Sequence, residues 1–263
     1  MADRPCRQRQ NWRRSAKGCI RSPAASPPGV RQTLTLLERA MQAGPGRPVQ
    51  LACDEVPSGT QVFDWQVPRE WQAREAWICG PDGKRRAEFA RHNLHLVGYS
   101  TPVRETMPLA RLQQHLHSLP DHPDWIPYRT SYYNETWGFC LTDTERRALP
   151  DGDYEVCIDT TLENGHLTLA EVLVPGASER EVLVCTHVCH PSLANDNLSG
   201  LAVATGLIRA LRSRDNALSY RFLFLPATIG AIAWLARNPQ TRQRVEHALV
   251  LSNLGDAGGF HTS

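Results

Sequence analysis

A histidine and an aspartate nine residues apart are the side chains best suited to chemistry. They are His187 and Asp196, in the segment EVLVCTHVCHPSLANDNLSG. A neutral imidazole and an ionised carboxylate are ordinary zinc ligands. We therefore interpret the pair as ligands of one metal ion. A structural interpretation stays open, in which Asp196 or Asn197 only caps a helix and His187 is a buried histidine with a polar partner.

The sequence around this pair predicts the elements that position it. The apolar run Val182–Cys185 is typical of a strand buried on both faces, and His187 follows it. Apolar residues recur at helical spacing over 198–211, so Asp196 should lie next to a helix start. Ligands of open α/β sheets bind outside the carboxyl ends of the strands. Both side chains are therefore expected at one such edge.

Two further apolar runs, Arg221–Pro226 and 248–254, are separated by a helical stretch that begins with Ile229–Arg237. The order strand, helix, strand, helix, strand predicts an α/β fold with a parallel sheet and right-handed crossovers. The last strand leads to Asp256, which should then reach the same edge as His187. This aspartate is the third expected metal ligand.

The pattern resembles the zinc aminopeptidase clan that includes bacterial leucyl aminopeptidases and relatives of glutamate carboxypeptidase. The clan motif is a His after a strand, Asp-Asn-x-Ser-Gly, a Glu-Glu pair, an Asp and a final His. His187, the run Asp196–Gly200 (DNLSG) and Asp256 match it in order. The resemblance implies a metal-dependent hydrolase that acts on an amide or peptide bond, with a peptide-like or amide-bearing small molecule as substrate.

Three longer segments are similar to a more specific group, the uncharacterised aminopeptidase-like family often found beside bacterial polysaccharide-biosynthesis genes. They are Ser58–Trp71, Ile126–Cys140 and Cys189–Gly200, within a resemblance that runs from about Gly29 to Phe260. It implies a three-layer αβα zinc-aminopeptidase-like domain with a β-rich inserted module. Because the chain stops before the motif's final His, the resemblance also implies an incomplete domain, truncated at its C-terminus.

The chain departs from the motif where the Glu-Glu pair should stand, because it has Ala227 and Thr228 there. Neither side chain can replace a carboxylate, so we expect one zinc ion at most, held by His187, Asp196 and Asp256. Three protein ligands and an open position are typical of a catalytic zinc. The general base must then come from elsewhere, and the candidates are Glu163, Glu171 and His190. The alternatives are an inactive binding or scaffold protein of the same fold, or a fragment.

The cysteines suggest a different site, because Cys185, His187 and Cys189 alternate onto one face if the strand continues. They allow a thiolate and imidazole metal site or a nucleophilic Cys189. The chain has eight cysteines and no secretory signal, which favours reduced thiols and a cytoplasmic location.

Composition predicts a soluble globular protein, since 41% of the 263 residues are hydrophobic and no apolar stretch is long enough to span a membrane. Residues 1–31 hold 8 of the 29 basic and 1 of the 27 acidic residues. We expect a disordered basic tail over 1–28, and no nucleic-acid partner. The aminopeptidase-like domain should comprise 29–53 and 169–263, with a helix near Val30–Met41, and the β-rich module 54–168. The oligomeric state is not predicted.

Aromatic residues concentrate in the expected module, which has five of the seven tryptophans. We predict that Tyr132, Tyr133 and Trp137, near Tyr128 and Arg129, contact the substrate, because binding clefts combine aromatic walls with a few polar groups. A small aromatic core of the module explains the same residues equally well.

Overall fold

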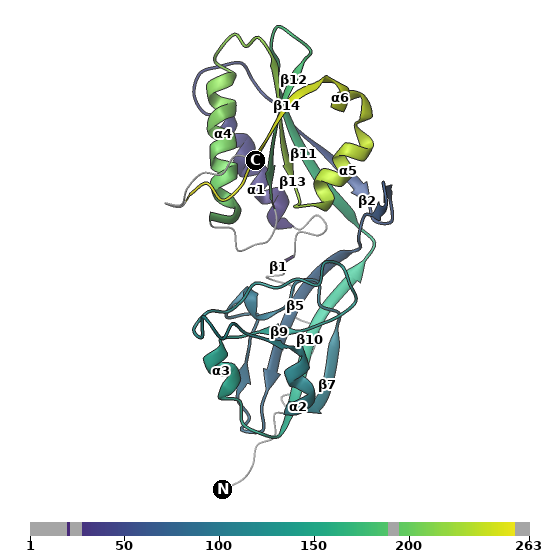
Figure 1. Cartoon of the computed structure of the whole chain (residues 1–263), viewed down its shortest axis with the longest axis vertical. Coiled ribbons are helices and arrows are strands. Elements are labelled where there is room, and N and C mark those ends of the chain that lie inside the picture. Colours follow the sequence, from purple (N-terminus) through teal and green to yellow (C-terminus); the bar gives the residue numbers. More distant parts are fainter. Residues whose placement is uncertain (1–19, 22–27, 189–194, 256–263) are drawn as a thin grey trace. The chain divides into compact units, whose positions relative to one another are not determined.

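The computed structural model of the chain describes residues 20–21, 28–188 and 195–255 (Figure 1). The expected basic tail, together with Cys189, His190 and Asp256, falls almost wholly outside these ranges. The described residues form two compact units. One comprises Ile20 and Trp71–Leu162, and the other combines the described residues of Arg21–Glu70 with those from Glu163 onward. Among the described residues, no helix is both long and apolar enough to cross a bilayer.

The second unit contains a five-stranded sheet in the order β14-β12-β13-β11-β2. Strand β12 is parallel to both of its neighbours, β14 and β13, while β11 is antiparallel to β13 and to β2. The expected parallel arrangement is confirmed, although β14 begins three residues earlier than predicted. The strands are β2 (Leu51–Pro57), β11 (His166–Val174), β12 (Glu181–His187), β13 (Ser219–Leu225) and β14 (Val245–Leu251).

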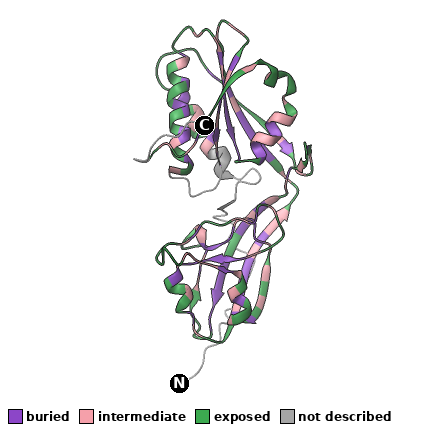
Figure 2. Cartoon of the chain, in the orientation of Figure 1, coloured by how far each residue is buried: buried purple, intermediate pink, exposed green. Residues whose placement is uncertain are grey.

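Helices cover the two faces of this sheet, which gives the expected three-layer αβα arrangement. In Figure 1, α1 and α4 lie on one side and α5 and α6 on the other. Alternate strand residues such as Val184 and Phe222 pack with Leu201 and Ile208 in one apolar core under α1 and α4. The helices are α1 (Pro28–Gln42), α4 (Gly200–Leu211), α5 (Ile229–Arg237) and α6 (Pro239–Arg244). The three inner strands β12, β13 and β11 are mostly buried or half-buried beneath them, whereas most residues of the edge strands β14 and β2 are exposed (Figure 2).

The other face of the sheet buries an ionic network beside apolar side chains such as Leu223 and Leu225. The guanidinium of Arg221 on β13 donates two hydrogen bonds to Glu181 on β12, at 2.7 and 3.0 Å, and one to Glu171 on β11, at 2.6 Å. The indole of Trp234 on α5 donates to the other oxygen of Glu171, at 3.0 Å. Burial alone would lower the pKa of Arg221, but the two carboxylates outweigh it and raise that pKa. The network therefore ties three adjacent strands and α5 together.

Truncating Arg221 should destabilise the chain strongly, because Glu181 would be left buried without its main partner. We expect Arg221→Ala to cost about 3–5 kcal/mol in chemical denaturation. The matched control is Arg237→Ala, which removes a solvent-exposed ion pair with Asp54 and should cost less than about 1 kcal/mol. Equal losses in the two variants would contradict this account of the network.

The first unit is β-rich, and its longest strands have 10 and 11 residues. Its sheet has the path β1-β5-β10-β7, with β6 paired to β5. The helix α3 begins with a capping box in which Thr142 and Glu145 satisfy each other's backbone N–H groups. A short helix over Leu109–Leu112 and a helical turn over Gln113–His115 lead into a strand that begins at Leu116.

The remaining bounds are β1 (Ile20–Arg21), β3 (Gln61–Val62), β4 (Trp65–Gln66), β5 (Glu70–Cys79), β6 (Arg85–Arg86), β7 (Val103–Pro108), β8 (Leu116–His117), β9 (Phe139–Cys140), β10 (Asp153–Glu163), α2 (Leu109–Leu112) and α3 (Asp143–Arg147), with short turns of helix at Asn93–His95, Gln113–His115 and Asn195–Ser199.

Candidate metal centre

The candidate site lies where the connections of two adjacent parallel strands diverge. The chain leaves β12 toward α4 on one face of the sheet, and leaves β13 toward α5 on the opposite face (Figure 1). Such a switch point opens a crevice at the carboxyl ends of the strands, where ligands of α/β proteins bind. His187, the last residue of β12, stands at this point.

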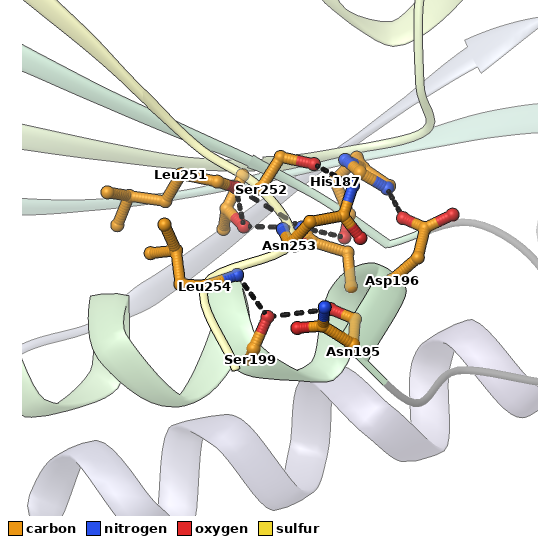
Figure 3. Close-up of polar contacts among 10 residues, drawn as sticks. His187, Asn195, Asp196, Ser199, Leu251, Ser252, Asn253 and Leu254 are labelled. Carbon is orange, nitrogen blue, oxygen red and sulfur yellow. Dashed lines mark hydrogen bonds and ion pairs between the residues drawn. The ribbon is translucent and has the colours of Figure 1, made fainter. Parts of the chain in front are cut away.

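His187 and Asp196, the first two ligands predicted from the sequence, are in direct contact. The Nε2 atom of His187 lies 2.6 Å from Oδ1 of Asp196, which is hydrogen-bonding distance (Figure 3). The His187 side chain is 20% exposed and that of Asp196 is 52% exposed. An imidazole nitrogen and a carboxylate oxygen therefore converge at a place that solvent reaches. This arrangement differs from a buried histidine that only satisfies a core hydrogen bond.

Asn197, which is fully buried, fixes the backbone around this pair. Its amide nitrogen lies 2.8 Å from Oγ1 of Thr186, 3.1 Å from the carbonyl oxygen of His187 and 3.3 Å from that of Leu251. It therefore joins the ends of β12 and β14. The N-cap of α4 is Ser199, without a capping side-chain hydrogen bond, so capping by Asp196 or Asn197 is not what the structure shows.

Gly200 permits this close approach. A Cβ atom there would lie 2.5 Å from Oδ1 of Asn197, 2.6 Å from the carbonyl oxygen of Leu251 and 2.6 Å from Oγ1 of Thr186. All three distances are shorter than real Cβ contacts allow. The start of α4 can therefore lie against both strand ends only if residue 200 is glycine.

Gly200→Ala should destabilise the chain, because the methyl group meets backbone and buried polar atoms that cannot move independently. Overpacking of this kind costs about 1–3 kcal/mol. Gly206→Ala on the same helix is the matched control, since a Cβ there meets nothing within 4 Å. That control should be neutral or stabilise by up to about 1 kcal/mol. Thermal unfolding of both variants checks the pair, and a neutral Gly200→Ala would refute the close approach.

The third expected ligand, Asp256, lies outside the described residues. Within the part of the chain that the structure describes, no group of three His, Cys, Asp or Glu side chains is placed to hold a metal ion. The described donors for a metal are thus the imidazole of His187 and the carboxylate of Asp196. Their chemistry suits zinc.

The end of β13 brings no carboxylate, but its backbone is unusual. Thr228 has φ 62° and ψ −76°, and the N–H of Ile229 donates to the carbonyl of Ala227 at 2.8 Å. These features define the rarer, strained form of γ-turn. A β-branched residue with positive φ is a clear outlier. The strained turn lies at the carboxyl end of the strand beside β12, where strain is often retained for function.

Replacing Thr228 with glycine should stabilise the fold by about 1 kcal/mol, since glycine adopts positive φ without the Cβ clash. Thr228→Ala is the control, because alanine keeps the Cβ and should give little of this gain. Urea denaturation of both variants measures the difference. A loss of stability in Thr228→Gly, or an equal gain in both, would show that the turn is not strained.

Glu171 and Cys185 were also candidates for a role in the chemistry, but their surroundings do not suit it. Both carboxylate oxygens of Glu171 are engaged, one by Arg221 and one by Trp234, so its proposed role as general base is not supported. Burial raises the pKa of the Cys185 thiol to about 11, which keeps it protonated at neutral pH and disfavours thiolate chemistry there. Cys189 and His190 lie outside the described residues.

The aromatic residues expected to contact substrate belong to the other unit. Trp137 stacks on His115, with ring centroids 3.6 Å apart, and Tyr133 meets Tyr99 edge to face at 5.2 Å. Tyr132 is 74% exposed. The ring contacts of Trp137 and Tyr133 are those of a small aromatic core. Substrate binding by Tyr132, Tyr133 and Trp137 stays a prediction.

Comparison with known structures defines the class of fold. The chain is similar to the crystal structure of a candidate peptidase from Clostridium acetobutylicum, with a TM-score of 0.81 and 44% identity, over 91% of this chain and 54% of that one. It is also similar to BSAP, a zinc aminopeptidase from Bacillus subtilis, with a TM-score of 0.61 and 13% identity, over 88% of this chain and 65% of that one. The fold is that of the zinc aminopeptidases.

The family is also defined. The model of the domain of unknown function DUF4910 matches residues 20–263, and the chain belongs to this family. A protein of Clostridium acetobutylicum, named as a candidate polysaccharide biosynthesis protein with an aminopeptidase-like domain, is 45% identical over 230 residues. These cover 88% of this chain and 51% of that protein, so the chain spans about half the length of this relative. The predicted aminopeptidase-like family is confirmed.

Proposed function

We propose that this protein is a metal-dependent hydrolase of the aminopeptidase-like fold that acts on an amide or peptide bond. One zinc ion would be held by His187, Asp196 and Asp256. The contact between His187 and Asp196 at the switch point of the sheet is the observation that carries the proposal. The fold shared with a zinc aminopeptidase supports the choice of metal.

The chain's own residues would perform distinct tasks at such a site. Asn197 holds the carbonyl of His187 and so fixes the end of β12 from which the imidazole projects. His187 and Asp196 supply two donors, and Asp256 would supply the third. Bound zinc polarises a carbonyl and lowers the pKa of its bound water toward neutrality. The exposure of Asp196 leaves the site open to a small peptide-like substrate.

A second candidate function is binding without catalysis. It is favoured by Ala227 and Thr228, which bring no carboxylate to the edge beside His187. In the peptidases that the chain resembles, a glutamate at that place takes the proton from water. A chain without it could keep the fold and the metal while serving as a binding or scaffold protein.

The biological setting is proposed from the named relative. That protein's description connects an aminopeptidase-like domain with polysaccharide biosynthesis, and we propose the same connection here. Among the described cysteines, Cys140, Cys157 and Cys185 are free thiols. This is compatible with the proposed cytoplasmic location.

The metal proposal predicts about one tightly held zinc ion per chain after loosely bound metal is removed by dialysis. His187→Ala and Asp196→Ala should each reduce the retained zinc strongly, because each removes one of three ligands. Elemental analysis of the purified proteins measures this. Circular dichroism should show that both variants remain folded.

His247→Ala and Asp215→Ala are matched controls, because both residues are exposed, His247 pairs with Val182 near the start of β12, and Asp215 forms its ion pair with Arg47. They should retain zinc like the unmodified chain. Two zinc ions per chain, or unchanged zinc in both site variants, would contradict the proposed site.

The missing glutamate pair predicts weak peptidase activity. Aminoacyl anilides should be hydrolysed slowly or not at all by the zinc-loaded chain, since general acid–base catalysis contributes typically about 10²–10⁴-fold. Any turnover should disappear when a chelator removes the zinc, and in Asp196→Ala. Turnover at ordinary aminopeptidase rates that Asp196→Ala abolishes would show that another residue acts as the base. Zinc binding without turnover favours the binding function.

A further inference from the structure

Three exposed aromatic residues lie close together in the sequence of the β-rich unit. Trp125, Tyr128 and Tyr132 are 61%, 56% and 74% exposed, and all three fall within a stretch of eight residues. The stretch belongs wholly to the unit that contains Trp71–Leu162. Rings of this size gain much from burial, yet the fold leaves them in contact with water. We name residues 121–135 the aromatic segment.

Backbone hydrogen bonds hold the aromatic segment to the rest of its unit. The N–H of Thr144 in α3 donates to the carbonyl of Pro123 at 3.1 Å. The N–H of Gly98 donates to the carbonyl of Arg129 at 2.8 Å, and the N–H of Ser131 donates to the carbonyl of Gly98 at 3.0 Å. Because the backbone that carries the rings is already fixed, little chain entropy is lost when a ligand contacts them.

The indole of Trp125 is held by a neighbouring ring. It stacks on the imidazole of His122, with centroids 4.1 Å apart and ring planes at 10°. The N–H of Trp125 also donates to the carbonyl of His122, at 3.0 Å. The imidazole covers one face of the indole while most of the residue stays exposed, so we expect the opposite face to receive a ligand.

Tyr132 has a backbone conformation that tyrosine rarely adopts. Its φ is 49° and that of Tyr133 is 72°, and the N–H of Asn134 donates to the carbonyl of Ser131 at 3.2 Å. This is a β-turn with positive φ at both central positions, where glycine and asparagine are usual and a bulky residue is strained. The ring of Tyr133 packs on Tyr99, but that of Tyr132 is exposed. Core packing therefore does not require tyrosine at 132, and strain of this kind is often retained for function.

The charges of the aromatic segment indicate the class of its ligand. It has three exposed carboxylates, Asp121, Asp124 and Glu135, and one exposed guanidinium, Arg129. Aromatic residues that stack on single-stranded nucleic acids lie in positively charged grooves, and the cores of protein interfaces are depleted of charged residues. A neutral sugar chain fits better, because its C–H faces can stack on aromatic rings and its hydroxyl groups can donate to carboxylates.

We propose that Trp125, Tyr128 and Tyr132 form a binding surface for a neutral polysaccharide chain. Consecutive residues of an extended chain span at most about 3.6 Å each, so Tyr128 lies within about 11 Å of Trp125 and about 14 Å of Tyr132. These spans suit an oligosaccharide of several rings. The surface goes beyond the proposed hydrolase function, because it needs neither zinc nor the residues around His187.

Affinity electrophoresis of the full chain tests this surface. Native gels would contain graded concentrations of one of four neutral polysaccharides: a mixed-linkage β-glucan, a galactomannan, an arabinoxylan or soluble starch. At least one of them should retard the chain. Trp125→Ala, Tyr128→Ala and Tyr132→Ala should each weaken this binding by about 2- to 10-fold, the size expected for a single aromatic contact.

Tyr132→Asn separates binding from folding, because asparagine tolerates positive φ better than tyrosine does. This variant should keep or raise the midpoint of thermal unfolding and still weaken polysaccharide binding as much as Tyr132→Ala. Phe63→Ala is the matched control, since Phe63 is an exposed aromatic residue of the other unit. Asp196→Ala, which removes a proposed zinc ligand, should also leave the retardation unchanged, so this proposal and the zinc site fail independently.

The proposal would be overturned if none of the four neutral polysaccharides retards the chain, or if the three alanine variants and Tyr132→Asn leave the retardation unchanged. Stronger retardation by polygalacturonate, or binding of fluorescent poly(dT) that Trp125→Ala abolishes, would show instead that the rings bind a polyanion. A dimer in analytical ultracentrifugation that Trp125→Ala abolishes would show that they contact a second copy of this chain, and would equally overturn it.

Discussion

The buried amide of Asn197 is the interaction on which the candidate site depends. It reaches the end of β12 through Thr186 and His187, and the end of β14 through Leu251. A buried amide left without partners costs free energy, so the strand ends and the turn must keep this arrangement together. Because Gly200 lets α4 begin against the same atoms, the sheet edge and the helix start form one rigid structure.

This rigidity explains how an irregular turn can hold a pair of polar side chains in contact. On one face the sheet is fixed by an apolar core beneath α1 and α4, and on the other by the ionic network around Arg221. Both carboxylate oxygens of Glu171 accept hydrogen bonds within this network, so Glu171 has a structural role, although the sequence alone allowed it a catalytic one. A carboxylate whose two oxygens already accept hydrogen bonds is a poor proton acceptor for substrate chemistry.

The sequence predicted those parts of the fold that local patterns determine. The buried runs of β12 and β13 are apolar on both faces, so their strands, parallel order and the position of His187 could be predicted. Part of β14 was missed because Glu246 and His247 are exposed and polar, and Glu246 pairs with Arg180. The role of Asn197 was missed for a different reason. Its partner Leu251 is 54 residues away, while helix capping offered a local explanation. The positive φ of Thr228 has no sequence signal, since glycine or asparagine would be expected there.

The central claim is that His187, Asp196 and Asp256 bind zinc through nitrogen and oxygen. X-ray absorption spectroscopy of the zinc-loaded chain tests it most directly, because zinc lies about 2.0–2.2 Å from nitrogen or oxygen ligands and about 2.3 Å from sulfur. We predict a coordination shell of nitrogen and oxygen alone, containing one imidazole that is lost in His187→Ala. A sulfur ligand would show instead that the cysteines near His187 bind the metal, and would contradict the account.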